Sequence, residues 1–183
     1  SISAFCNAGF DLMGIKAPFS SLTDYSADPV VSIVIALLIV VGGIGFLTWE
    51  DIRTNRLHFH RYRMQSKVIL SVTAALIFIP TVYFFFFEFA QFPMGERLLL
   101  SVFQAITPRT AGFNTADLTA ISETGQSIIT ILMLIGSSPG STAGGMKTTT
   151  LAVLVASALA VFRRRENPHF FNRRGSSETV SQA

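Results

Sequence analysis

The sequence has 183 residues, of which 50% are hydrophobic and only 14% charged, with a net charge of +3. A soluble domain carries about 25% charged residues, so this composition argues against an ordinary soluble protein. The single cysteine, Cys6, excludes an intrachain disulfide. The chain starts at Ser1, in the middle of a pattern and without an initiator methionine, and we expect it to be a fragment of a longer protein.

Two apolar segments are long enough to cross a membrane. Residues 30–49 and residues 68–87 each form a run of twenty without a charge. A helix rises about 1.5 Å per residue, so each run spans a hydrocarbon core of about 30 Å. Pro80 lies inside the second run, which membrane helices tolerate when neighbouring groups satisfy the freed carbonyl. We predict one spanning helix for each run, with close helix packing at the glycines of the first.

A third apolar region, from residue 127 to residue 162, is interrupted in its middle. It is too long for one straight span and too short for two spans with a loop between them. The polar loop, as we name this interruption, consists of Gly136, Ser137, Ser138, Pro139, Gly140, Ser141, Thr142, Ala143, Gly144 and Gly145. Pro139 argues against continuous helix, so we predict two half-helices around a non-helical stretch, a form that survives in a membrane only when covered by protein or water.

The distribution of charge predicts the orientation. Most of the basic residues lie in two short segments, residues 53–67 and residues 163–183, whereas acidic residues dominate the other connections. The positive-inside rule places both basic segments in the cytoplasm of a multi-pass plasma-membrane protein, and we expect a bacterial cytoplasmic membrane. Anionic lipid or nucleic acid would also suit such clusters, but orientation alone explains them, and we predict no nucleic-acid partner.

Two loops on the outer side share a short motif, polar-Ala-Gly-Phe-Asp/Asn, 103 positions apart. The second is preceded by residues 96–106, an amphipathic stretch too short to span. The first repeat loop contains Asn7, Ala8, Gly9 and Phe10, and the second repeat loop contains Thr110, Ala111, Gly112, Phe113 and Asn114. Glycine suits a loop whose carbonyls must point one way, and rings of carbonyls replace the hydration shell of K⁺ in known filters.

These motifs resemble those of a known family. CNAGFD and PRTAGFNT are similar to the filter sequences of the Trk/Ktr/HKT superfamily of potassium transporters, and GSSPGSTAGGMKTTT resembles its interrupted inner helix. The resemblance implies an all-α membrane protein of span–pore-helix–span repeats with re-entrant filter loops and one broken inner helix. It also implies filter glycines at Gly9 and Gly112, and a gating role for the polar loop.

By the same resemblance, the chain covers part of a four-repeat protein whose first and fourth repeats are missing. Residues 1–52 would end the second repeat, residues 53–67 form a cytoplasmic connection, residues 68–162 make up the third repeat, and residues 163–183 are cytoplasmic. Family members commonly form homodimers that assemble with a cytosolic nucleotide-binding regulatory subunit. We therefore expect a homodimer, this regulatory subunit and the lipid bilayer as partners.

The function we predict is K⁺ uptake, with the carbonyls of Asn7, Ala8, Gly9, Thr110, Ala111 and Gly112 as the ion ligands. We expect no enzyme activity, no cofactor and no metal site beyond K⁺ at these carbonyls. The alternative is a secondary transporter of a small organic solute that binds at the broken helix, although such a solute needs no repeated carbonyl loops.

Two cations near the loops leave their roles open. Lys147 follows the polar loop and either repels K⁺ until the gate moves, or extends to the cytoplasm, or neutralises carbonyls freed by the broken helix. Arg109 precedes the second repeat loop, and we favour an ion pair at the outer mouth with Asp11, Asp117 or a carboxylate of a missing repeat.

Overall fold

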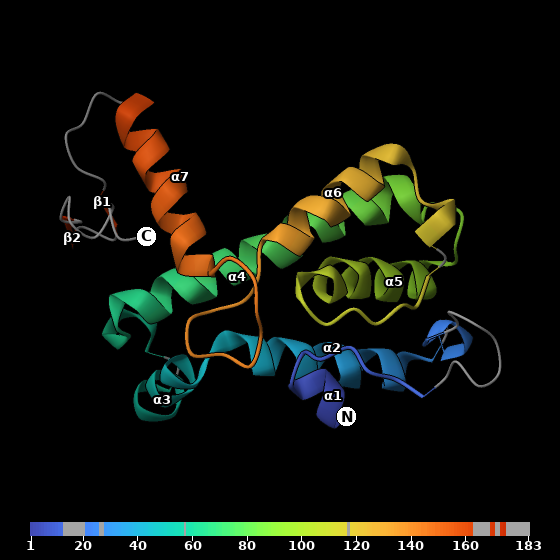
Figure 1. Cartoon of the computed structure of the whole chain (residues 1–183), viewed down its shortest axis with the longest axis horizontal. Helices are drawn as coiled ribbons and strands as arrows, with labels where there is room; N and C mark the ends of the chain where they lie inside the picture. Colours follow the sequence, from blue (N-terminus) through green and yellow to red (C-terminus); the bar gives the residue numbers. More distant parts are fainter. Residues whose placement is uncertain are drawn as a thin grey trace.

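The protein is helical throughout most of its described length (Figure 1). The computed structural model describes residues 1–12, 21–25, 28–56, 58–116, 118–162, 169–170 and 173–174. Its α-helices are α1 (Ile2–Phe5), α2 (Pro29–Ile44), α3 (Phe46–Asn55), α4 (Met64–Tyr83), α5 (Met94–Ile106), α6 (Glu123–Leu134) and α7 (Thr148–Phe162). A π-turn, η4 (Phe84–Glu88), prolongs α4, and short 3₁₀ turns are η2 (Thr23–Tyr25), η3 (Phe59–Arg61), η5 (Thr107–Arg109) and η6 (Leu118–Ala120). Two-residue strands β1 (His169–Phe170) and β2 (Arg173–Arg174) pair antiparallel, so the predicted helical class is confirmed with this one small addition.

Helix α4 with its π-turn is the candidate membrane span of the described residues. It runs from Met64 to Glu88, and only 28% of its most apolar window is buried inside the protein. A core helix of a soluble protein would be mostly buried, so the exposed apolar side chains favour contact with lipid. Pro80 sits within α4, and the Thr81 hydroxyl donates to the Ile77 carbonyl one turn earlier, at 2.7 Å. The predicted second span is therefore found where the sequence places it.

The first apolar run is not a straight span, which corrects the prediction for residues 30–49. Helix α2 stops at Ile44, and α3 leaves it at 96° after the break. Gly45 stands at the corner with φ of 91°, a conformation that side chains other than glycine's disfavour. The Trp49 indole N–H donates to the Val41 carbonyl at 3.0 Å, which satisfies one of the carbonyls freed at the end of α2.

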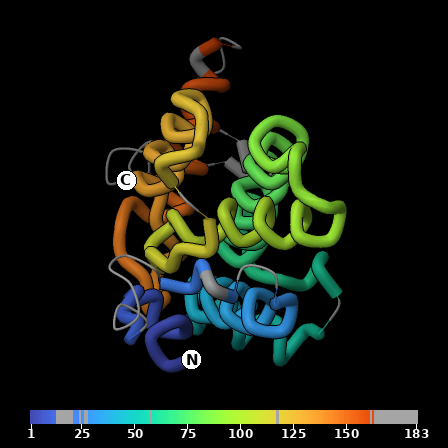
Figure 2. The backbone as a smooth tube through the Cα atoms, turned by 90° about the vertical axis from the view of Figure 1, so that its right-hand side faces the viewer, coloured from blue at the N-terminus to red at the C-terminus, as the bar shows by residue number. Residues whose placement is uncertain are grey.

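The short helix α5 occupies the centre of the structure, between α2 and α4 (Figure 2). One apolar core cluster joins it to α1, to α2 and to the second repeat loop, and consists of Ala4, Leu22, Ala36, Ile39, Phe103, Ile106, Ala111 and Phe113. A second cluster joins it to α4, η4 and α6, and consists of Phe84, Phe89, Leu100, Ile121, Ile129 and Leu132. Helix α5 therefore packs against the second repeat loop, and it lies where a short helix was predicted, at residues 96–106.

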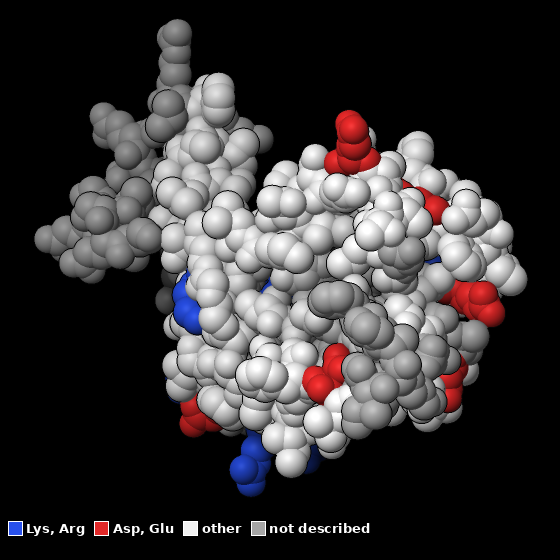
Figure 3. Space-filling view, turned by 45° about the vertical axis from the view of Figure 1, so that its right-hand side comes forward, with Lys and Arg blue, Asp and Glu red and all other residues white. Residues whose placement is uncertain are grey.

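The face of the protein shown in Figure 3 carries few charged side chains. Large exposed residues include Leu37 at 58%, Phe78 at 70%, Ile79 at 67% and Phe87 at 73% of full exposure. Soluble proteins rarely expose apolar patches of this extent. Hydrocarbon is the solvent that such a surface suits, in agreement with the composition.

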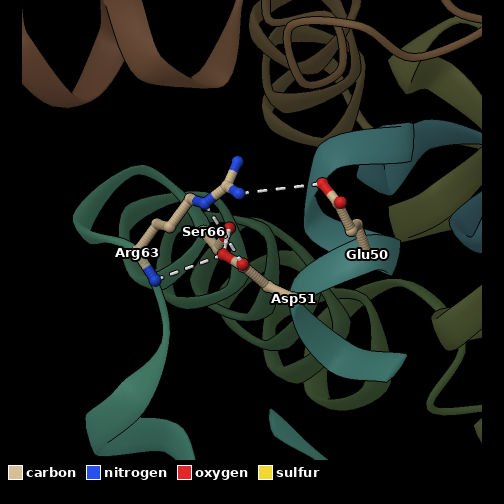
Figure 4. Close-up of polar contacts among 4 residues, drawn as sticks. All are labelled: Glu50, Asp51, Arg63 and Ser66. Atoms are coloured by element: carbon tan, nitrogen blue, oxygen red, sulfur yellow. Dashed lines mark hydrogen bonds and ion pairs between the residues drawn. The ribbon is translucent and has the colours of Figure 1, made fainter. Parts of the chain in front are cut away.

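A buried carboxylate fastens α3 to the start of α4 (Figure 4). Asp51 is 4% exposed and accepts from the Ser66 hydroxyl at 2.5 Å and from the Arg63 backbone N–H at 3.2 Å. The Arg63 guanidinium lies 3.5 Å from Asp51 and 3.8 Å from the exposed Glu50. Asp51 thus acts across the connection as a cap for the N-terminus of α4, where an anion is favourable.

We expect Gly45→Ala to destabilise the α2–α3 corner by about 1–3 kcal/mol from backbone strain alone. A Cβ at this position would also lie 2.7 Å from the Pro139 carbonyl oxygen. Gly95→Ala is the matched control, since its Cβ would meet nothing within 4 Å and alanine favours the helix α5 in which Gly95 lies. Thermal unfolding of the full-length protein in detergent measures the difference, and equal midpoints for both variants would contradict it.

Asp51→Asn should destabilise the protein by about 1–3 kcal/mol, because a buried charge-assisted cap is replaced by a neutral amide. Glu50→Gln makes the same chemical change one residue earlier, at a side chain that is 60% exposed, and should shift stability by less than about 1 kcal/mol. Denaturation of the full-length protein compares the two, and a loss in Glu50→Gln as large as that in Asp51→Asn would refute the role given to Asp51.

Candidate functional site

The two repeat loops adopt the same unusual backbone pattern. Asn7 and Gly9 have φ of 53° and 71°, and Thr110 and Gly112 have φ of 123° and 76°. Each pair occupies equivalent positions of the motif, 103 residues apart. Positive φ is rare outside glycine, so Asn7 and Thr110 show that the two loops share positive φ at equivalent positions, although the two residues lie in different parts of the positive-φ region.

This backbone shape leaves a set of carbonyl groups without partners. The N–H groups turn inward: Ala8 donates to Ser3 O at 2.9 Å, and both Ala111 and Gly112 donate to Thr107 O at 3.1 Å. Among the described residues, no hydrogen bond reaches the carbonyl oxygens of Asn7, Ala8, Gly9, Phe10, Thr110, Ala111 and Gly112. Ala8, Phe10 and Gly112 are exposed, so this row of unpaired carbonyls is open to a cation or to water.

The end of the second repeat loop is bound differently. The Phe113 carbonyl accepts from the Thr107 hydroxyl at 2.6 Å, and the Asn114 carbonyl accepts from Leu22 N–H at 2.8 Å. Asn114 N–H in turn donates to the Ser21 hydroxyl at 3.2 Å. Phe113 and Asn114, both in the predicted site, therefore anchor the loop to the core and to residues 21–22. The sequence did not single out Thr107, since its counterpart in the first copy is Ala4 and the repeat carries no signal there.

The two repeat loops lie against each other. A Cβ built on Gly9 would stand 2.3 Å from the Ala111 carbonyl oxygen, so only glycine fits this approach. At Gly112 a Cβ would meet nothing within 4 Å among the described atoms. Phe10, also in the predicted site, is 82% exposed, whereas Phe113 is buried in the core. Only one of the two phenylalanines thus anchors its loop.

The polar loop is folded tightly on itself between α6 and α7. Gly136 N–H donates to Met146 O at 2.9 Å, Ser137 N–H to Gly144 O at 3.3 Å, and Thr148 N–H to Ser137 O at 3.2 Å. The Ser141 hydroxyl donates to the Ser138 carbonyl at 2.6 Å. The loop therefore satisfies much of its backbone internally, which a non-helical segment needs where water is excluded.

The polar loop reaches the corner between α2 and α3 (Figure 1). Ser138 N–H donates to Gly43 O at 3.1 Å, Thr142 N–H to Gly42 O at 3.3 Å, and Phe46 N–H to Gly140 O at 3.0 Å. Glycines of the first apolar run were predicted to allow helix packing; in the structure they admit this loop instead. A Cβ on Gly43 would lie 2.9 Å from the Ser137 hydroxyl oxygen, which shows how little room remains.

Arg109 points inward rather than to the outer mouth. Its side chain is 7% exposed, and Nη2 donates to the Gly136 carbonyl at 3.5 Å. It also lines a small pocket together with Gly43, Thr73 and Ser137. The described residues include no ion pair between Arg109 and Asp11, and Asp117 lies outside them. The described contact of this cation is thus with the start of the polar loop.

Lys147 neutralises a freed carbonyl, one of the roles left open by the sequence. Its ammonium group donates to the Ala143 carbonyl at 3.0 Å, within the same loop. Proximity to a carbonyl dipole lowers the cost of an ammonium group wherever water is excluded. Arg109 and Lys147 thus both contact the polar loop, which lies between the half-helices α6 and α7.

The first repeat loop and the polar loop meet at a polar contact. The Asn7 side-chain amide donates to the Thr142 hydroxyl oxygen at 3.2 Å. Most of the residues predicted for the site are thereby brought into one assembly, formed by the first repeat loop, the second repeat loop and the polar loop. The remaining predicted segment, residues 163–183, lies largely outside the described residues.

Comparison with known proteins gives consistent matches. A family model named TrkH, described as a cation transport protein, matches residues 1–182. The potassium/sodium uptake protein NtpJ of Enterococcus hirae is 38% identical over 191 residues, covering 100% of this chain and 39% of that protein. The Ktr system potassium uptake protein B of Bacillus subtilis is 36% identical over 179 residues, covering 94% of this chain and 39% of that protein.

A solved structure shares the fold. The crystal structure of the potassium transporter TrkH from Vibrio parahaemolyticus aligns with a TM-score of 0.75 at 14% identity, over 98% of this chain and 39% of that one. The helical arrangement described above is therefore that of a transporter of known structure. The chain spans about two fifths of the length of the relatives that it matches.

We expect Gly136→Ala to open the polar loop, because its Cβ would stand 2.0 Å from the Gly144 carbonyl oxygen that accepts from Ser137. The full-length variant should unfold at a lower temperature in detergent and show faster proteolysis within the loop. Gly144→Ala is the matched control on the other side of the same contact, where a Cβ meets nothing within 4 Å. Equal effects of both substitutions would contradict the close approach.

Proposed function

The chain belongs to the TrkH family of cation transport proteins, and we propose that it forms part of a K⁺ uptake protein in which the two repeat loops act as a selectivity filter. The family resemblance is confirmed, and with it the prediction that the chain belongs to no enzyme family. Relatives named for potassium and for potassium/sodium uptake support K⁺ as the transported ion. In a selectivity filter, the unpaired carbonyls would be the ligands of the transported ion.

The observation that carries this proposal is the matched backbone of the two loops. Positive φ occurs at two equivalent positions of each loop, the N–H groups of Ala8, Ala111 and Gly112 donate within the protein, and the carbonyls of residues 7–10 and 110–112 have no donor among the described residues. A cation that sheds its hydration water needs oxygen ligands at fixed positions, and backbone carbonyls supply them without a charged side chain. An organic solute would not require the same carbonyl pattern twice.

The filter proper would consist of the carbonyls of Asn7, Ala8 and Gly9 in the first repeat loop and of Thr110, Ala111 and Gly112 in the second. Phe113 and Asn114 would hold the second loop, since their carbonyls already accept hydrogen bonds. Repeats outside this chain would complete the ring of ligands around the ion path. The open space in front of Gly112 supports this arrangement.

The polar loop would gate the path on the cytoplasmic side of the filter. Its contacts with Gly42, Gly43 and the first repeat loop place it beside the proposed filter, and its glycines and serines permit another conformation. Residues 53–67 and 163–183 would face the cytoplasm, because they hold most of the basic residues. A homodimer with a cytosolic nucleotide-binding regulatory subunit is the assembly that we propose for the whole protein.

Gly112→Ser tests the filter. Serine at φ of 76° is strained, and its side chain would enter the space before the carbonyls. With the full-length protein in liposomes, we expect the wild type to pass K⁺ in preference to Na⁺, and Gly112→Ser to reduce this preference about tenfold, the effect of about 1.4 kcal/mol.

The matched control is Gly95→Ser, at a glycine that also has no neighbour within 4 Å but lies at the far end of α5. Its flux and ion preference should equal those of the wild type. If the wild type moves neither ion, or if Gly112→Ser keeps the full preference, the repeat loops are not the filter and the broken helix becomes the candidate solute site.

A further inference from the structure

Three segments that are far apart in the sequence meet at Thr142. Its hydroxyl oxygen lies 2.9 Å from the Phe5 carbonyl oxygen, 3.1 Å from the Gly42 carbonyl oxygen and 3.2 Å from the amide nitrogen of Asn7. The hydroxyl has one proton, so it donates to one of the two carbonyls and accepts from Asn7. The polar loop is thereby tied to the first repeat loop and to α2 through a single side chain.

The surroundings of this junction leave little freedom. A Cβ on Gly42 would lie 1.9 Å from the Phe5 carbonyl oxygen and 3.0 Å from the Asn7 amide nitrogen, so α2 approaches as closely as its backbone allows. Asn7 is 7% exposed, and its Oδ1 has no partner among the described residues. Its amide nitrogen lies 3.4 Å from the carbonyl oxygens of both Phe5 and Ile39, longer contacts than that with Thr142.

Asn7 also supplies one of the free carbonyls, at a backbone φ of 53°. The side chain that bonds Thr142 and the carbonyl that faces the proposed ion path thus belong to the same strained residue. If Thr142 moves away, the Asn7 amide keeps only its long contacts and the constraint on this backbone weakens. Polar groups that are buried and half satisfied respond strongly to the loss of a partner.

The second repeat loop has no such link. Thr110 occupies the position equivalent to Asn7, and its hydroxyl has no hydrogen-bond partner in the described part of the chain. The connection of that loop to the polar loop runs instead through the preceding residue, Arg109, to the Gly136 carbonyl at 3.5 Å. The tie between Asn7 and Thr142 is therefore particular to the first repeat loop.

We propose that Asn7 and Thr142 are positioning residues that couple the state of the polar loop to the affinity of the first repeat loop for K⁺. This inference rests on the proposed filter function. A cation bound at the carbonyls holds the first repeat loop in the described conformation, which keeps the Asn7 amide on Thr142 and the polar loop in place. By linkage, displacement of the polar loop lowers the affinity for K⁺ by a certain factor, and bound K⁺ lowers the equilibrium constant for displacement of the loop by the same factor.

Accessibility of the polar loop to a charged thiol reagent tests this coupling. The reporter is Gly144→Cys, at an exposed glycine whose Cβ would meet nothing within 4 Å, in the full-length protein stripped of other cysteines, Cys6→Ser included. The modification rate is measured in liposomes with K⁺ and with choline as the sole small cation. In the reporter protein we expect K⁺ to slow modification about fivefold, the value of one hydrogen bond of about 1 kcal/mol.

Thr142→Val removes the hydroxyl with little change of shape, and should give fast modification that no longer depends on K⁺. Thr142→Ser keeps the hydroxyl and should restore the dependence on K⁺. Thr130→Val is the matched control, because that hydroxyl bonds only the Gln126 carbonyl of its own helix, at 2.9 Å. Asn7→Gly removes the amide that donates to Thr142, and glycine tolerates the positive φ of this position. The double variant Asn7→Gly/Thr142→Val should be modified at the same rate as Thr142→Val alone.

The outcomes separate this inference from the function on which it rests. Wild-type full-length protein that carries no K⁺ flux contradicts the proposed filter. If K⁺ flux is normal but K⁺ still slows thiol modification in both Thr142→Val and Asn7→Gly, the coupling alone is overturned. The coupling is also overturned if K⁺ flux is normal and K⁺ does not slow modification of the reporter protein. Should Thr142→Val fail to fold, Asn7→Gly with Thr142→Ser carries the same comparison.

Discussion

Hydrogen bonding of a non-helical backbone, away from water, is the constraint on which this structure depends. Within a bilayer the polar loop and the repeat loops cannot rely on solvent, and each N–H group must find an acceptor in the protein. The polar loop meets this requirement partly by itself and partly through α2, whose Gly42 and Gly43 carbonyls accept from it. In the opposite direction, Phe46 N–H at the α2–α3 corner donates to the Gly140 carbonyl of the polar loop.

The candidate site arises where this requirement is not met, at the carbonyl groups of the repeat loops that accept no hydrogen bond from the described residues. In the repeat loops the N–H groups of Asn7, Ala8, Ala111 and Gly112 have acceptors, whereas the carbonyls of the same residues have no donor among the described residues, an arrangement that a bare cation can use. Packing against α5 and α2 holds the second repeat loop in this state, because Ala111 and Phe113 belong to the same apolar cluster as Phe103 and Ile39. Burial of these two side chains therefore keeps the unpaired carbonyls between and before them in position.

Several features could be predicted because they depend on local sequence. The span at Met64–Glu88 follows from an uncharged apolar run, and the break between α6 and α7 follows from a polar stretch with Pro139. The short helix α5 and the family resemblance follow from the motifs around it. The straight span predicted for residues 30–49 was wrong, because an apolar run of that length does not reveal that a distant loop is wedged at Gly45.

The sequence by itself determined the class of the protein, its candidate span, the place of the broken helix and the loops that repeat. These are recorded in length, hydropathy and the positions of glycine, all of which act within a few neighbouring residues. Only the tertiary structure decided which carbonyls stay free, why Phe113 and Asn114 differ from Gly112, and where Arg109 points. Those outcomes depend on contacts between segments as distant as Asn7 and Thr142, and the geometry of such contacts is set by packing that no local pattern encodes.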